Sequence, residues 1–144
     1  VISYNYGAGM YDRCKKTLKD AVIFGWTLMI IGTLCFEIIP GPMLSVFSRD
    51  AKVIEIGVNA FHIIGMSFIL LVTSLTFPVY FQAIGQSVKS SLLTVLRTVV
   101  LFVPLGWLLS KLGLKYFWCT FPVTEFITTA AGLIMLKRFR GNYE

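Results

Sequence analysis

The sequence predicts an all-α integral membrane protein with four transmembrane helices, and three observations lead to this fold class. Apolar residues make up 56% of the 144 residues, charged residues only 14%, and the mean hydropathy is +0.78, whereas roughly a quarter of the residues in soluble domains are charged. Four apolar runs are long enough to cross a bilayer core, which takes about 20 helical residues. The basic residues cluster between these runs rather than along one polar face. We therefore expect the lipid bilayer as a partner, and no nucleic acid.

Residues 1–20 are predicted to form a cytoplasmic loop. Tyr4 and Tyr6 suit the headgroup layer, Gly7 and Gly9 suit the end of a helix, and a basic cluster follows them. Only two apolar residues precede this stretch, and the first is not methionine. We therefore expect the loop to follow a membrane helix that is truncated in this sequence.

The first two predicted spans cover about residues 21–39 and 57–83. The first ends at Pro40, because proline lacks the amide donor and the residue before it avoids helical angles. The second is longer than a bilayer core requires, so we expect it to tilt. Pro78 is expected to kink it near one end.

The third and fourth predicted spans cover about residues 92–109 and 117–136. The third ends in a short polar loop, and the fourth ends in a basic run. The transmembrane region is therefore predicted to occupy residues 21–136, and residues 137–144 to form a cytoplasmic tail.

The distribution of basic residues predicts that both ends of the chain are cytoplasmic. With four spans, the two ends and the middle loop hold eight basic residues, and the opposite loops hold four. Cytoplasmic loops carry the excess of lysine and arginine. Arg97 lies about two turns inside the third span, and we expect its side chain to reach back to the cytoplasmic interface.

Six side chains of the second span, most of them polar, are predicted to share one face. Four of them recur every seven residues, and the other two each follow three residues after one of these four. This stripe is either the wall of a cavity or a helix-packing surface. His62 is the only histidine and has no partner at ligand spacing, so we expect no metal site. The members of the stripe are Asn59, His62, Met66, Thr73, Thr76 and Tyr80.

Glu125 is the best-placed intramembrane carboxylate, and it is a candidate for cation coupling together with the stripe. It shares a face with Thr128, Thr129 and Gly132. The alternative is a neutral glutamic acid bonded to a nearby threonine or backbone carbonyl. Glu37, one turn from the end of its span, is expected to be a solvated interfacial carboxylate. The sequence has no HExxH, GxSxG or paired-aspartate motif, so we expect no enzyme, no catalytic residue and no cofactor.

Several motifs resemble the multidrug and toxic compound extrusion (MATE) transporters, from the end of their eighth helix to their twelfth. Together they cover essentially the whole chain in the family's order. They are Ser-Tyr-Asn-Tyr-Gly-Ala-Gly at 3–9, Tyr-Phe-Gln-Ala-Ile-Gly-Gln at 80–86, Leu-Thr-Val-Leu-Arg at 93–97, Val-Pro-Leu at 103–105, and Trp118 followed by Phe-Pro-Val-Thr-Glu at 121–125.

The resemblance implies four helices of the C-terminal six-helix lobe of a twelve-helix carrier. Such a carrier exchanges Na⁺ or H⁺ for small organic, often cationic, compounds by alternating access across the plasma (inner) membrane. The missing N-terminal helices of the same transporter would be its partners, and four helices alone are not expected to transport. Two positions depart from the family pattern: His62 stands where many bacterial members have arginine, and Gln86 replaces the usual lysine.

Two alternatives to multidrug efflux remain open. A lipid-linked oligosaccharide flippase of the same superfamily should line its cavity with basic residues, whereas Arg97 is the only cation within a predicted span. A non-transporting four-helix membrane subunit would have the same hydropathy, but it gives no reason for the polar stripes.

Overall fold

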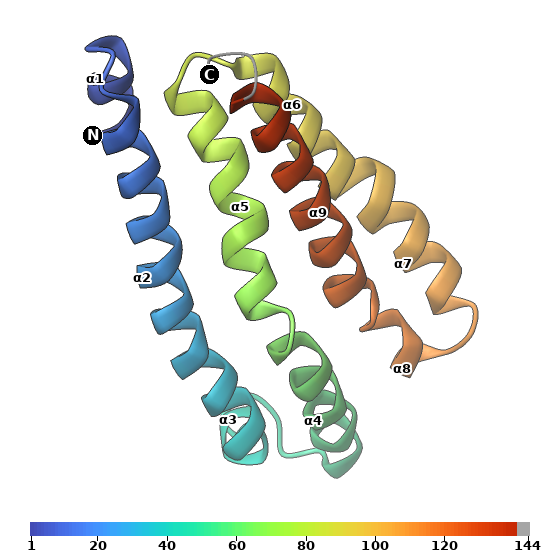
Figure 1. Cartoon of the computed structure of the whole chain (residues 1–144). Helices are drawn as coiled ribbons and strands as arrows, with labels where there is room; N and C mark the ends of the chain where they lie inside the picture. The colour runs from blue at the N-terminus through green and yellow to red at the C-terminus, as the bar shows by residue number, and fades with distance from the viewer. Residues whose placement is uncertain (141–144) are drawn as a thin grey trace.

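The computed structural model describes residues 1–140, and every regular element in that range is a helix (Figure 1). The predicted tail at 137–144 thus lies partly outside the described residues, and its first four residues continue the last helix. In chain order the elements are α1 (Ile2–Gly7), α2 (Tyr11–Ile38), α3 (Pro40–Ser45), α4 (Ala51–Gly65), α5 (Phe68–Ala83), α6 (Ser87–Val95), the π-helix η1 (Leu96–Phe102), α7 (Val103–Ser110), α8 (Leu114–Phe117) and α9 (Thr120–Arg140).

The N-terminal stretch contains more helix than the sequence predicts. α1 covers the expected interfacial residues, Gly9 makes the turn with φ of +71°, and α2 begins at Tyr11. The predicted span starts ten residues later, at Ala21. The intervening lysines have high helix propensity, so the polar approach to the apolar run stays helical. α2 ends at Ile38, immediately before the proline-rich turn, close to the predicted end.

The second predicted span is broken into α4 and α5, which meet at an angle of 53°. The break lies at Met66 and Ser67, just after Gly65, and α5 continues through Pro78 without interruption. The sequence did not predict this break, and the kink expected at Pro78, nearer the other end of the span, stays a prediction. Gly65 has no Cβ, so the backbone bends there more readily than at other residues. Gly65 also lets α4 approach α2, since a Cβ there would lie 3.2 Å from Cβ of Phe36.

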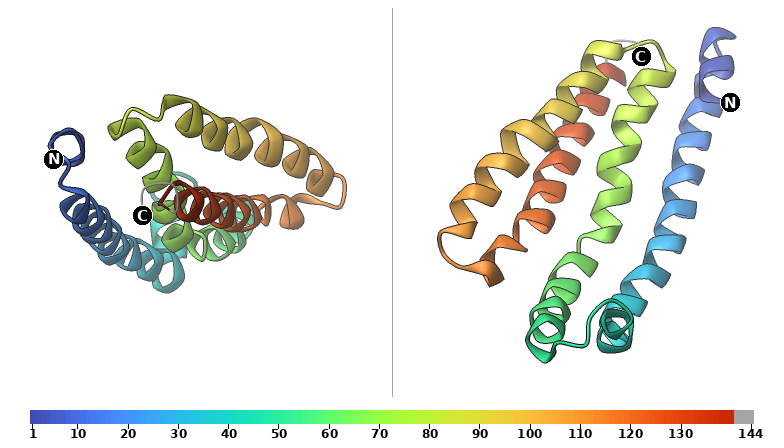
Figure 2. Two further views of the ribbon diagram at one scale, coloured as in Figure 1. Left: turned by 45° about the horizontal axis from the view of Figure 1, so that its top comes forward. Right: turned by 180° about the vertical axis from the view of Figure 1, so that it is seen from behind.

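α5 lies between α2 on one side and α9 on the other, and the two views of Figure 2 agree on this order. The continuous helix formed by α6, η1 and α7 packs against α9 and α5 and forms the opposite edge from α2. Buried side chains gather near the end of α5 and include Phe77, Phe81, Leu93 and Phe139.

Three helical segments are long and apolar enough to cross a membrane: Tyr11–Ile38, Ser87–Ser110 and Leu114–Phe139. The bent pair α4–α5 makes a fourth if it is counted as one broken span. Large apolar side chains such as Phe24, Trp107 and Phe126 are exposed along these segments. Hydrocarbon rather than water suits such a surface. The chain is thus an all-helical, multi-pass membrane protein.

Candidate functional site

Glu125 is a buried carboxylate in the apolar part of α9. Its side chain is 4% exposed, and α9 belongs to a segment with the length and hydropathy of a membrane span. A carboxylate removed from water is costly unless its oxygens are bonded by other groups. The partners of Glu125 come from η1 and α5, and together these side chains form the candidate site.

Arg97 on η1 is the main partner of Glu125. Its Nε donates to both carboxylate oxygens, at 3.0 Å from Oε1 and 3.2 Å from Oε2, and its Nη2 lies 2.6 Å from Oε1. Such a forked, charge-assisted contact fixes the orientation of both side chains. The expectation that Arg97 reaches back to the interface is therefore wrong, because a carboxylate on α9 lies within its reach.

The π-helical turn that carries Arg97 can be explained by Pro104, which comes shortly after it in the sequence. Pro104 lacks the N–H that would bond the carbonyl of Val100, and its ring crowds that carbonyl. A widened turn over Leu96–Phe102 absorbs this conflict while Ser87–Ser110 remains one helical segment. Such π turns occur often at functional sites. Here the turn places a guanidinium beside the carboxylate of α9.

Ser74 on α5 completes the network. It is fully buried, and its hydroxyl donates to Oε2 of Glu125. One guanidinium, one carboxylate and one hydroxyl thus connect η1, α9 and α5, and the charges of the network balance. The structure gives Glu125 an arginine and a serine as partners, in place of the threonine or backbone carbonyl of the alternative prediction.

Three threonine hydroxyls lie along α9 beside Glu125. Thr120, Thr124 and Thr128 are each no more than 1% exposed, and their Oγ1 atoms have no hydrogen-bond partner within the described chain. They recur every four residues and so occupy one face of α9. Buried hydroxyls without protein partners are typical positions for water or an ion. The surroundings of Glu125 are therefore polar along more than two helical turns.

His62 and Glu37 form a second pair, between α4 and α2. Nδ1 of His62 lies 2.6 Å from Oε2 of Glu37, and the two side chains are 39% and 37% exposed. The sequence offers His62 no acidic partner at helical spacing, because the partner belongs to another helix. Glu37 is half-exposed as expected, but it is also bonded to the imidazole.

The remaining predicted site residues separate into two groups. Asn59 donates to the carbonyl of Glu55, and Thr76 donates to the carbonyl of Val72, so each bonds its own helix. Thr73 and Tyr80, in contrast, line a groove between α2, α5 and α9. The predicted continuous stripe is divided, because the break at residues 66–67 places its first half on α4 and its second half on α5.

Sequence reasoning left Arg97, Ser74 and Glu37 out of the candidate site. A usable signal existed for Arg97: it and Glu125 are opposite charges within two apolar runs, and such charges usually pair inside a membrane. Ser74 carried no signal, because a single serine in an apolar run is common. Within residues 1–140, no cluster of three or more histidine, cysteine, aspartate or glutamate side chains could hold a metal ion.

The comparisons with known proteins identify the family. The MatE family model matches residues 1–108, from α1 into α7, so Arg97 lies within the match and Glu125 lies beyond it. Searches of curated proteins and of solved structures gave no match. The matched residues make up most of the chain and include the shared motifs at 3–9, 80–86, 93–97 and 103–105, whereas the motif at 118–125 lies beyond the match. The chain therefore belongs to the MATE family, whose members are membrane transporters.

Proposed function

We propose that the chain works in a secondary active efflux transporter that exchanges Na⁺ or H⁺ for organic, often cationic, compounds by alternating access. The charge distribution favours both ends of this segment on the cytoplasmic side, and the plasma (inner) membrane is the location that the resemblance to MATE transporters implies. The observation that carries the proposal is the Arg97–Glu125–Ser74 network. It places an ionisable carboxylate inside an apolar helix, next to the three unpartnered threonine hydroxyls.

The network supplies a physical link between ion binding and helix position. Arg97 stays charged under all physiological conditions. When a proton or Na⁺ binds the Glu125 carboxylate, the positive charge of Arg97 loses its compensation. The guanidinium must then find another anion or move toward water. Because Arg97 belongs to η1 and Glu125 to α9, ion binding favours a different packing of these two elements.

The other predicted cation or cavity residues have weaker roles in this proposal. Thr73 and Tyr80 face a groove that Glu125 does not line, and His62, on α4 just before the break at residues 66–67, is bonded to Glu37. Asn59 and Thr76 bond backbone carbonyls of their own helices. We therefore assign cation coupling to Glu125 first and keep these five residues as secondary candidates.

A lipid-linked oligosaccharide flippase is less well supported by the geometry. It requires uncompensated cations along the transport path, and the charge of Arg97 is already balanced by Glu125. A non-transporting membrane subunit gives no role to a buried ion pair that joins two spans. The efflux hypothesis uses this pair directly, and it predicts which residue must respond to the coupling ion.

Glu125→Gln tests the proposal in cells that express the natural gene product carrying this chain. Everted membrane vesicles are prepared from these cells, and the uptake of a fluorescent cationic dye into the vesicles, which reports efflux activity, is followed under an imposed H⁺ or Na⁺ gradient. We expect gradient-driven efflux to fall at least tenfold, because glutamine cannot exchange a proton or bind Na⁺ as a carboxylate does. The amount of protein in the membrane is expected to stay the same.

Glu55→Gln is the matched control. Glu55 is an exposed carboxylate on α4, and the hydrogen bond that it accepts from Asn59 uses its backbone carbonyl rather than its side chain. We expect this variant to keep full transport. Full gradient-driven efflux by Glu125→Gln would exclude Glu125 as the coupling residue. Efflux that ignores both gradients in the unmodified protein would exclude ion-coupled exchange itself.

A further inference from the structure

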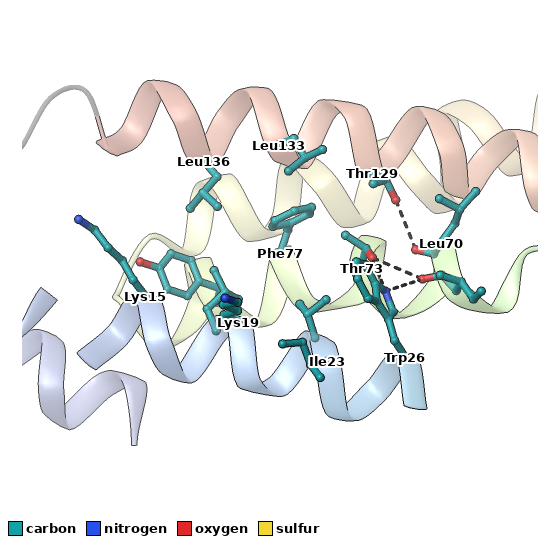
Figure 3. Close-up of a pocket in the computed structure, with 14 residues that line it drawn as sticks. Lys15, Lys19, Ile23, Trp26, Leu70, Thr73, Phe77, Thr129, Leu133 and Leu136 are labelled. Carbon is teal, nitrogen blue, oxygen red and sulfur yellow. Dashed lines mark hydrogen bonds between the residues drawn. The ribbon is translucent and has the colours of Figure 1, made fainter. Parts of the chain in front are cut away.

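A long apolar groove runs over α5, between α2 and α9 (Figure 3). Its volume is about 710 Å³, and it is separate from the Arg97–Glu125 network, none of whose members line it. α5 contacts both α2 and α9 and forms the floor of the groove. The question that the structure raises is which molecule fills this space.

The two ends of the groove differ in polarity. Lys15 and Lys19 of α2 stand at one end, and Trp26, Thr73 and Thr129 stand at the other (Figure 3). From Lys15 to Trp26, α2 advances about 16 Å at about 1.5 Å per residue. Half of a bilayer core is about 15 Å thick. The groove thus has the depth of one leaflet, with its lysines at the membrane surface.

The middle of the groove is apolar. It is lined by aliphatic side chains such as Leu18, Val22, Leu133 and Leu136, together with the ring of Phe77. An occupant that carried a polar group at this depth would lose its hydrogen bonds to water without replacement. The lining therefore favours a hydrocarbon chain.

The polar atoms at the deep end of the groove already have partners within the protein. Nε1 of Trp26 donates to Oγ1 of Thr73 at 3.0 Å, with the carbonyl of Ile69 also at 3.1 Å. The hydroxyl of Thr129 donates to the carbonyl of Leu70 at 3.3 Å. No polar group of the occupant is needed to satisfy these atoms. A hydrocarbon chain can end there without leaving a lining donor unpaired.

The surface end of the groove is positively charged. Residues 12–20 hold four basic and two acidic side chains, and two of the basic ones, Lys15 and Lys19, line the groove. Lys15 contacts Asp12 at 3.6 Å, but the Asp12 side chain is 99% exposed. Such an exposed ion pair contributes little to stability, and both lysines keep a positive charge at this end of the groove.

We propose that the groove binds an anionic glycerophospholipid, with one acyl chain over α5 and the phosphate between Lys15 and Lys19. The apolar middle matches the chain, the depth matches one leaflet, and the charge at the surface end matches the phosphate. A zwitterionic lipid would bring its own cation to the two lysines, and a hydrophilic anion would leave the apolar walls empty. The anionic phospholipid satisfies both parts of the groove.

Trp26 makes the proposal measurable, because its ring lines the deep end of the groove. The chain has three tryptophans, so a background with Trp107→Phe and Trp118→Phe leaves Trp26 as the sole reporter. This protein is placed in phosphatidylcholine nanodiscs with a small fraction of phosphatidylglycerol, brominated near the end of one acyl chain. We expect this lipid to quench Trp26 several-fold more than the same fraction of equally brominated phosphatidylcholine.

Three charge variants locate the headgroup. Lys15→Gln with Lys19→Gln is expected to abolish the preference for phosphatidylglycerol, since each lysine near an anionic headgroup is worth about a fivefold change in affinity. Lys16→Gln, an exposed lysine that does not line the groove, is expected to keep the preference. Circular dichroism of each variant shows whether the helices are intact. A separate variant, Lys15→Arg with Lys19→Arg, keeps both positive charges and is expected to retain the preference for phosphatidylglycerol.

Several results would overturn the proposal. Equal quenching by both brominated lipids would mean that the groove meets bulk lipid without selection. Loss of the preference in inorganic phosphate, at an ionic strength matched with chloride, would indicate a site for free anions. Loss of the preference with Lys16→Gln as well would indicate attraction by the whole basic cluster rather than a site at the groove. None of these results would affect the Glu125 assignment, because dye efflux depends on a different set of residues.

Discussion

Two pairs of charged or ionisable side chains, both within the part of the chain that the structure describes, join helices, and their surroundings differ. The Arg97–Glu125 pair lies between η1 and α9, where the Glu125 side chain is 4% exposed and Ser74 adds a further hydrogen bond. The His62–Glu37 pair lies between α4 and α2, with both side chains more than one-third exposed. Water can replace a lost partner at the second pair, but it has little access to Glu125.

Helix packing also differs between the elements that carry the two pairs, and it is tighter on the side of the buried pair. Two turns along α9 from Glu125, the buried ring of Phe77 on α5 rests on Gly132. On the helix that carries His62, Gly57 of α4 faces the flexible, half-buried side chain of Leu44. The comparison shows that one chain contains a buried, tightly packed region and a more exposed region that can adjust. Substitutions should therefore cost much more in the first region than in the second.

Arg97→Met is expected to give the largest loss of stability. The variant keeps an unbranched apolar stem but leaves the Glu125 carboxylate buried without its cation. Removing one partner of a buried ion pair typically costs about 3–5 kcal/mol. The measurement is thermal unfolding in mild detergent, followed by circular dichroism.

The combined variant Arg97→Met with Glu125→Leu separates charge from packing. Replacing both members of a buried pair by apolar side chains is often neutral or stabilising, so we expect most of the lost stability to return. If the double variant were as unstable as Arg97→Met, the buried charge would not be the cause of the loss.

The sequence was sufficient to predict an all-helical fold with segments that could cross a membrane, because hydropathy and length are properties of single segments. It also placed Glu125 among the candidates, since a carboxylate inside an apolar run stands out. The bend between α4 and α5 was not predicted, because proline is the strongest local signal for a kink and the only proline of that span is Pro78, near its other end. The observed break at residues 66–67 depends instead on Gly65 and its close approach to α2.

Pairs between helices could not be predicted from spacing within one helix. Arg97 and Glu125 meet because η1 and α9 pack at the same depth, and His62 meets Glu37 because α4 leans on α2. Both arrangements depend on helix packing, and no repeat in the sequence encodes them. Opposite charges in separate spans are the useful signal, whereas a single buried serine such as Ser74 gives none.

Gly132→Ala is expected to have an intermediate effect, and Gly57→Ala is its matched control. A Cβ on Gly132 would overlap the Phe77 ring and lie 2.8 Å from its Cγ. Phe77 is only 4% exposed, so the ring has little room to move. Overpacking of this kind costs about 1–3 kcal/mol, partly offset by the higher helix propensity of alanine, about 1 kcal/mol.

A Cβ on Gly57 would lie 2.7 Å from the end of the Leu44 side chain, which can rotate away. We therefore expect Gly57→Ala to be neutral or slightly stabilising in the same thermal unfolding measurement. Equal losses at the two glycines would contradict the contrast between a rigid and an adjustable region.

The His62–Glu37 pair is expected to give the smallest effect, measured by a double-mutant cycle of His62→Gln and Glu37→Gln. The single variants leave a side chain that water can reach, so neither leaves a buried, unpaired charge. Exposed ion pairs typically contribute about 0–1 kcal/mol, and salt screens them. We expect a coupling energy within that range, and we expect it to fall further at high salt. The same cycle at Arg97 and Glu125 is expected to give a larger coupling energy that salt changes little.

A coupling energy above about 2 kcal/mol for His62–Glu37 would mean that α2 and α4 are held as firmly as α9 and η1. The distinction between the two regions would then rest on packing alone.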